Sequence, residues 1–237
     1  MTDPAKHGQI RTYGRRRGRP LRPQRAGLLR DLLPRLAVPV SAIQRAPGTL
    51  DPRTLFDQPP REVWLELGFG SGEHLAAQAQ AHPAAGFIGC EPFENGVAAL
   101  LRHVADMKLA NLRIHPDDGR PLIDALIDAS IAGLFILFPD PWPKKRHHER
   151  RIVSAAMLGH FARILKDSGR LRLATDDMAY AAEMDALTAS HPAFARLGGG
   201  MQATGWRPDD APISRYEQKA RRKGDVPVFI ELERKPR

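Results

Sequence analysis

Residues 131–151 read Ile-Ala-Gly-Leu-Phe-Ile-Leu-Phe-Pro-Asp-Pro-Trp-Pro-Lys-Lys-Arg-His-His-Glu-Arg-Arg. Residues 131–138 are apolar without interruption, which is typical of a buried strand in a parallel sheet. Prolines at 139, 141 and 143 then end the strand, because proline has no N–H for a ladder and restricts the residue before it. The stretch predicts a strand that stops at a stiff turn carrying one carboxylate, Asp140, and one indole, Trp142.

A cationic run continues from this turn, with Lys144, Lys145, Arg146, Arg150 and Arg151. A rigid acid and an aromatic ring beside cations suit a planar polar group on a polyanion, such as a nucleobase in RNA or DNA. Taken singly, the turn and the basic run are equally typical of a solvated surface. Their joint position at the end of a buried strand favours a binding site, in which the indole either stacks on a base or packs the turn.

Strand and helix patterns alternate on both sides of this stretch. Strand patterns cover residues 62–67, 86–91, 112–115, 131–138, 170–174 and 226–232. Helix patterns cover residues 73–81, 95–108, 121–129, 151–165 and 178–189. This alternation predicts βαβ units with right-handed crossovers and hence a parallel sheet.

Composition and charge divide the 237 residues into two parts. Residues 1–60 are predicted to form a basic, Pro-rich N-terminal extension that is partly disordered. Residues 61–237 are predicted to form one α/β domain, since 42% of the chain is hydrophobic. Of the net charge of +9, residues 1–25 contribute +7. Such a tail suits phosphate contacts, with a merely solubilising tail as the alternative.

Several classes of protein are disfavoured. No run of 18 apolar residues is present, so no membrane span is expected, and the N-terminus lacks the apolar segment of a signal peptide. The single cysteine, Cys90, excludes an internal disulfide and fits a reducing compartment, so a cytoplasmic protein is expected. No metal site is predicted, because His147 and His148 are adjacent and have no spaced third ligand.

A glycine loop follows the first predicted strand. Gly68, Gly70 and Gly72 let the backbone turn sharply and approach a ligand. Glu91 ends the next strand, where an acid can bond the hydroxyls of a ribose. Glu73 stands where a dinucleotide fingerprint requires glycine, and its carboxylate would repel a pyrophosphate. The loop therefore favours a nucleoside without phosphates, S-adenosylmethionine above all.

Two further acids belong to this predicted site. Asp118 follows the third strand, where a carboxylate can accept from an adenine amino group. Glu66 precedes the glycine loop and either accepts from the methionine ammonium or holds the loop in shape. The adjacent Asp117 leaves a choice for adenine, and Asp118 is the favoured one.

The order of these motifs resembles that of the bacterial tRNA (guanine-N7)-methyltransferases, from about residue 62 to the C-terminus. The shared motifs are Leu-Glu-Leu-Gly-Phe-Gly-Ser-Gly, Gly-Cys-Glu, Phe-Pro-Asp-Pro-Trp-Pro-Lys-Lys-Arg-His-His-Glu-Arg-Arg, Ala-Thr-Asp and Ser-Arg-Tyr-Glu. The Pro-Asp-Pro-Trp block with its basic continuation is highly specific. The glycine loop only places the chain among class I methyltransferases.

The resemblance implies an α/β, Rossmann-like class I methyltransferase fold, with a mostly parallel seven-stranded sheet and helices on both faces. It implies S-adenosylmethionine as the methyl donor and N7 of a guanine in the tRNA variable loop as the acceptor. The products would be 7-methylguanosine and S-adenosylhomocysteine. No preference between a monomer and a homodimer, or among tRNAs, is implied.

The resemblance also carries roles onto particular positions. The implied cofactor contacts are Glu66, Gly68, Gly70, Gly72, Glu91, Asp118 and Asp140, with Asp140 also catalytic. The implied substrate contacts are Lys144, Asp176, Ser214, Arg215, Tyr216 and Glu217. The family commonly has Thr-x-Phe-Glu at the last of these stretches, so this chain keeps a hydroxyl and an aromatic there. Cations expected to meet phosphates are Lys144, Arg146, Arg150, Arg151, Arg215 and Lys219.

Other functions compete with this interpretation. Asp-Pro-Trp resembles the motif of exocyclic-amine methyltransferases, but the second proline is missing. A non-catalytic RNA-binding protein is disfavoured by the intact loop and Glu91, and a nicotinamide dehydrogenase by Glu73. Cys90 is a candidate nucleophile for pyrimidine methylation, yet its place inside a strand favours packing.

Overall fold

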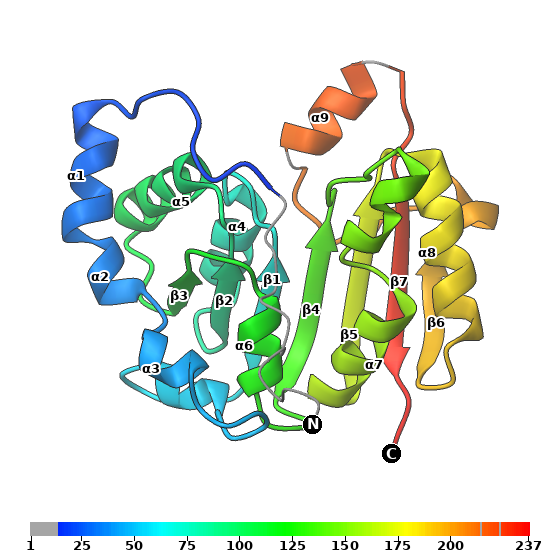
Figure 1. Ribbon diagram of the computed structural model, residues 1–237, viewed down its shortest axis with the longest axis horizontal. Helices are drawn as coiled ribbons and strands as arrows, with labels where there is room; N and C mark the ends of the chain where they lie inside the picture. The colour runs from blue at the N-terminus through cyan, green and yellow to red at the C-terminus, as the bar shows by residue number, and fades with distance from the viewer. Residues whose placement is uncertain (1–13, 214, 223) are drawn as a thin grey trace, which may run out of the picture.

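The computed structural model describes residues 14–213, 215–222 and 224–237. Its centre is a seven-stranded sheet with the order β3-β2-β1-β4-β5-β7-β6 (Figure 1). The strands are β1 Val63–Leu67, β2 Gly86–Cys90, β3 Leu112–His115, β4 Ile131–Leu137, β5 Leu165–Thr175, β6 Phe194–Gly199 and β7 Val228–Arg234. Strands β1 to β5 run parallel, and β7 pairs antiparallel with both β5 and β6.

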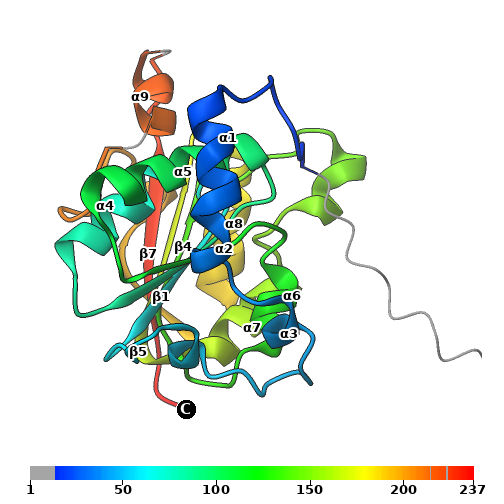
Figure 2. The ribbon, with the colours of Figure 1, turned by 90° about the vertical axis from the view of Figure 1, so that its left-hand side faces the viewer.

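Helices join the strands and cover both faces of the sheet. The α-helices are α1 Pro23–Asp31, α2 Leu33–Leu36, α3 Val40–Ile43, α4 Glu73–Ala81, α5 Glu94–Met107, α6 Arg120–Ala125, α7 Ala155–Ile164, α8 Met178–Ser190 and α9 Arg215–Arg222. Short 3-10 helices are η1 Pro52–Leu55, η2 Lys145–Arg150 and η3 Met201–Ala203. Figure 2 shows α4 and α5 on one side of the sheet and α6 and α7 on the other. Within the described ranges, no helix combines the length and apolarity needed to cross a membrane.

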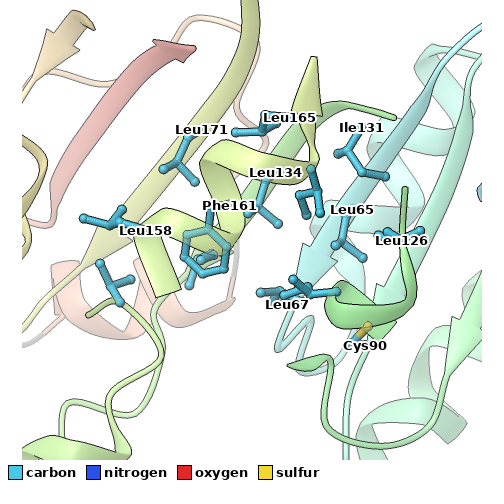
Figure 3. Packing of buried hydrophobic residues seen from close by; sticks show 14 of the residues in the cluster. Leu65, Leu67, Cys90, Leu126, Ile131, Leu134, Leu158, Phe161, Leu165 and Leu171 are labelled. Atoms are coloured by element: carbon cyan, nitrogen blue, oxygen red, sulfur yellow. The ribbon is translucent and has the colours of Figure 1, made fainter. Parts of the chain in front are cut away.

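The strands alternate their side chains between two apolar clusters. Val63, Leu65 and Leu67 of β1 belong to the cluster under α6, α7 and α8, whereas Trp64 packs with the cluster under α4 and α5. Figure 3 shows the larger cluster, where Phe161 of α7 meets leucines of β1, β4 and β5. Burial of both faces explains why β4 is an uninterrupted apolar run.

Two elements differ from the sequence-based prediction. Strand β6 has no predicted counterpart, because its Gly-rich, half-exposed sequence forms a strand only by pairing with β7. The segment forming α9 has no predicted secondary structure, and in the structure it is a helix that buries Glu217 and Ala220. The seventh strand implied by the resemblance is thus present, and it completes the sheet at the β7 edge.

The described part of the N-terminal extension contains short helices. Prolines 34 and 39 divide it into short helices rather than preventing helix formation. The apolar side chains of α1 and α2 pack on the cluster under α5, with Leu36 buried there. The Val38 N–H donates to the Ile114 carbonyl of β3 at 2.8 Å. Residues 1–13 of the predicted basic tail lie outside the described residues, whereas the arginines of the tail from Arg15 onward lie within them.

Candidate active site

A cavity of about 360 Å³ opens at the carboxyl ends of the parallel strands. Its walls come from the segments that follow β1, β2, β3 and β4, at residues 67–70, 90–93, 117–120 and 138–142. The sheet order places β1 and β4 side by side although their connections leave in opposite directions. Ligands of open α/β sheets bind at such a switch point, and this volume is in the range of small-molecule sites.

Glu91 organises the glycine loop on one side of the cavity. Its carboxylate accepts from the Gly70 N–H at 2.8 Å and from the Phe93 N–H at 2.9 Å. Burial raises the pKa of Glu91, while these two N–H groups act in the opposite direction. Each carboxylate oxygen keeps a second lone pair, so the side chain can also accept from the two hydroxyls of a ribose.

Both candidate adenine acids line the cavity and both have protein partners. Asp118 pairs with Arg120 and accepts from the Arg120 N–H at 3.0 Å. Asp117 accepts from the Asp118 N–H at 2.7 Å and pairs with Arg16 of the N-terminal segment. The arginines therefore partly neutralise this wall of the cavity and orient both carboxylates.

Asp140 lies on the opposite wall, on the turn that follows β4. Its neighbours Phe138 and Trp142 both have left-handed backbone conformations, with φ of 53° and 46°. Asp140 itself is exposed and lines the cavity together with Trp142 and Arg150. The Arg150 guanidinium carbon lies 5.0 Å from the Trp142 ring centroid. The sharp turn thus brings a carboxylate, an indole and a cation to the same opening.

Two residues of the predicted cofactor set do not line the cavity. Glu66 is 2% exposed and lies on the far face of β1, where one oxygen is 2.7 Å from Nδ1 of His74. Gly72 is the N-cap residue of α4 with φ of 78°, and a Cβ there would lie 2.6 Å from the Leu100 side chain. Glu66 and Gly72 therefore support the glycine loop without lining the cavity, because they lie in the segments, β1 and the start of α4, that flank the loop.

The described members of the predicted substrate set lie around the same edge of the sheet. Lys144 is exposed just beyond the Asp140 turn, and Asp176 is exposed at the end of β5. Leu137 of β4 pairs with Ala174 of β5, so the acids that follow these strands stand near one another. Glu217 is 1% exposed and pairs with Arg207. Ser214 and the side chains of Arg215 and Tyr216 lie outside the described part of the structure.

Two arginines have surroundings that sequence analysis did not predict. Arg151, expected at phosphates, is only 5% exposed and turns inward. Arg15 lines the cavity, because the Gly18 N–H and the Arg19 carbonyl both bond Asn95 and hold the N-terminal segment over α5. No local sequence signal predicts this contact with α5, since arginine-rich segments with this composition are usually solvated.

In the described residues, no group of three or more His, Cys, Asp or Glu is arranged for a metal ion.

Gly96 offers a test of the loop geometry. A Cβ at this position of α5 would lie 2.3 Å from the Gly70 carbonyl oxygen, so Gly96→Ala must displace the glycine loop. Overpacking of this kind costs about 1–3 kcal/mol. We expect the Kd for S-adenosylmethionine to rise by about tenfold or more in calorimetric titration. Gly159→Ala is the control, because nothing lies within 4 Å of its Cβ. Equal affinity of both variants would show that the loop position does not matter.

Comparison with known proteins identifies the family. A family model described as "Putative methyltransferase" matches residues 60–229. A tRNA (guanine-N(7)-)-methyltransferase of Rhodospirillum rubrum is 45% identical, covering 96% of this chain and 89% of that protein. One from Caulobacter sp. strain K31 is 44% identical, covering 99% of this chain and all of that protein. The chain belongs to the tRNA (guanine-N(7)-)-methyltransferase family.

Solved structures share the fold of this tRNA (guanine-N(7)-)-methyltransferase family member. The 16S rRNA methyltransferase KamB superposes with a TM-score of 0.56 at 13% identity, over 78% of this chain and 91% of that one. An rRNA methylase from Streptococcus thermophilus gives a TM-score of 0.50 at 14% identity, over 73% and 87%. The predicted fold class is confirmed, since these neighbours have the Rossmann-like methyltransferase sheet.

Proposed function

We propose that this chain transfers the methyl group of S-adenosylmethionine to N7 of a guanine in the tRNA variable loop, giving 7-methylguanosine and S-adenosylhomocysteine. One observation carries the proposal for this member of the family. The Asp140 turn, with its cationic continuation, borders the same cavity as Glu91 and the glycine loop. A cofactor site and an acceptor site therefore share one opening.

The residues of the cavity fit S-adenosylmethionine. Glu91 would hold the ribose hydroxyls, and Asp118 or Asp117 the adenine amino group. Gly68 and Gly70 leave room for the backbone to approach the ligand. When bound, the sulfonium supplies an activated methyl group. The carboxylates around the cavity suit this cation better than they suit a phosphate.

The acceptor needs little activation. Guanine N7 carries a lone pair and no proton at neutral pH, so it can attack the methyl carbon while the carbon–sulfur bond breaks. No general base is required, and the protein contributes positioning and electrostatic support. Asp140 and Asp176 would accept hydrogen bonds from the N–H donors of guanine. Their negative charge would also stabilise the cationic ring that forms.

The tRNA phosphates would meet the exposed cations around the opening. Lys144, Lys145 and Arg146 are all exposed and follow the Asp140 turn directly. Lys144 and the segment 214–217 would contact the tRNA close to the target guanine. Residues 61–237 would thus form the methyltransferase domain, with the N-terminal segment closing one wall. The substrate also suggests that the protein works in the cytoplasm, where tRNA is matured.

The salt dependence of tRNA binding tests the role of the exposed cations around the opening. Each phosphate contact contributes a slope of about 0.7–0.9 to the plot of log tRNA affinity against log salt. Lys145→Gln with Arg146→Gln is expected to flatten that slope by about 1.4–1.8. Arg30→Gln is the control, because that arginine pairs with Asp31 on α1. An unchanged slope in the double variant would remove these two cations from the tRNA surface.

The function itself is tested by methyl transfer from labelled S-adenosylmethionine to unmodified tRNA, followed by nucleoside analysis. We expect label in 7-methylguanosine. Label on an adenine or cytosine amino group would instead support an exocyclic-amine methyltransferase. Binding of tRNA and cofactor without transfer would support a non-catalytic RNA-binding protein.

A further inference from the structure

The turn that carries Asp140 has few backbone N–H donors of its own. Three of residues 139–143 are prolines, which have no N–H to donate. Phe138 and Trp142 both adopt left-handed conformations that L-residues rarely take. Conformations of this kind persist only where the surrounding structure fixes them. A side chain that bonds the turn from outside would meet this need.

Arg151 is the side chain that reaches the turn. Its Nε donates to the Pro141 carbonyl at 2.8 Å. Its NH1 pairs with Glu183 of α8, and its guanidinium carbon lies 4.5 Å from the ring centroid of Tyr180 on the same helix. The Tyr180 hydroxyl in turn accepts from the Val153 N–H at 3.1 Å. The buried guanidinium is thus fixed by a carbonyl, a carboxylate and an aromatic ring.

Helix α8 is a firm anchor for this contact. It begins at Met178, directly after the Asp176–Asp177 pair that follows β5. Asp177 caps the helix by accepting from the Tyr180 N–H at 2.8 Å. Arg151 therefore joins the segment after β4 to the segment after β5, which are the two segments that present Asp140 and Asp176.

We infer that Arg151 is a positioning residue, which ties the Pro139–Trp142 turn to α8 and so sets the place of the Asp140 carboxylate. The inference rests on the proposed function, because it assigns Asp140 a task that depends on position. Arg151 is not among the residues that line the cavity. Arg151 acts through the turn and does not contact the substrate. This positioning role replaces the phosphate contact expected of Arg151 from the sequence.

The guanidinium is specifically required for this link. Its planar fork offers Nε to the carbonyl and NH1 to the carboxylate in fixed directions, and its flat face stacks on the tyrosine ring. A lysine at this position keeps the charge for Glu183 but has no second donor fixed toward Pro141. Arg151→Lys therefore removes the bond to the turn while sparing the charge balance of the site.

Arg163 provides a matched control. Like Arg151, it combines backbone carbonyl bonds with a carboxylate: it donates to the carbonyls of Leu126 and Ile123 at 2.6 Å each and pairs with Asp128. These contacts surround the start of β4, at the opposite end of that strand from the Asp140 turn. Arg163→Lys makes the same chemical change without touching the turn, so it reports the general cost of losing such bonds.

Both variants are compared with the wild type in methyl transfer to tRNA, thermal unfolding and binding. For Arg151→Lys we expect kcat to fall by about tenfold or more. The Kd values for S-adenosylmethionine and tRNA should stay within about twofold, and both variants should lose similar thermal stability. The double variant Arg151→Lys with Asp140→Ala should be no slower than Asp140→Ala alone, since both act through one carboxylate. Unchanged kcat, weakened tRNA binding at full kcat, or additive losses would each overturn the inference.

A second readout does not depend on activity. The chain has three tryptophans, so ¹⁹F NMR of protein labelled with 5-fluorotryptophan gives a small set of signals, and Trp142→Phe assigns the one in the turn. We expect this signal to shift or broaden in Arg151→Lys and to stay in place in Arg163→Lys. An unmoved signal would contradict the positioning role. If the wild-type protein transferred no methyl group to tRNA, the proposed function would be contradicted. The ¹⁹F signal of Trp142 would still show whether Arg151 fixes the turn.

Discussion

Asp140→Ala is expected to lower the rate of methyl transfer by about 10²–10³-fold, the loss typical of removing one preorganised electrostatic group. The carboxylate is exposed on the cavity wall, so its removal leaves no buried cavity and should cost little stability. Affinity for tRNA should change by less than about threefold, because the phosphates supply most of that binding. Single-turnover transfer and a tRNA binding titration measure the two effects.

Two further variants sharpen the test of Asp140. Asp140→Asn keeps the size and one acceptor oxygen, so a rate between those of wild type and alanine would separate charge from hydrogen bonding. Asp106→Ala removes an exposed acid from α5, where it pairs with Arg102, and should leave the rate unchanged. If Asp140→Ala weakened tRNA binding as much as it slowed transfer, its role would be binding and the catalytic assignment would fail.

Glu91→Ala is expected to raise the Kd for S-adenosylmethionine by about 100-fold or more. Hydrogen bonds to a charged group contribute about 1.5–3 kcal/mol each, and two ribose hydroxyls would lose their acceptor. The Gly70 and Phe93 N–H groups would also lose theirs, so the glycine loop would lose its fixed position. Calorimetric titration with the cofactor measures the loss. The control is Glu94→Gln, which removes an acid of α5 that pairs with Arg17.

The raised pKa of Glu91 adds a pH dependence to this binding. Burial is the main cause of the raised value, so the carboxylate becomes protonated at a higher pH than an ordinary glutamate does. The ribose hydroxyls require the ionised acceptor, and cofactor affinity should therefore fall as the pH drops through that raised value. In Glu91→Gln the pH dependence should disappear. A wild-type affinity that stays constant on acidification would argue against a ribose contact.

The parallel part of the fold could be predicted because its information is local. Strand β4 is a continuous apolar run and α4 matches its predicted bounds, since each has its own pattern and stop signals. Strand β6 could not be predicted, because its pairing with β7 is long-range and its sequence is Gly-rich. The short N-terminal helices could not be predicted either. Helices α1 and α2 are stabilised by packing on the apolar cluster under α5, and α3 by packing on the cluster under α6, and their own sequence does not indicate these partners.

Some residues of the candidate site could likewise be predicted from the sequence, and others could not. Glu91, Asp118 and Asp140 each follow a strand of the parallel sheet, so topology alone brings them to one cavity. The inward orientation of Arg151 depends on Glu183 and Tyr180 of a later helix, whereas the sequence pattern groups Arg151 with the cations expected to meet phosphates. Charge predicted from sequence gives the type of ligand, whereas burial decides which charges can reach it.

The central claim is that guanine N7 attacks the methyl group beside Asp140, and replacing N7 in the substrate tests it most directly. Two tRNA transcripts differ only at the target nucleoside of the variable loop, which is guanosine in one and 7-deazaguanosine in the other. The account predicts transfer to the first, no transfer to the second, and similar affinity for both, because the Watson–Crick edge and the phosphates are retained. Transfer of a methyl group to that nucleoside of the 7-deazaguanosine transcript would contradict it.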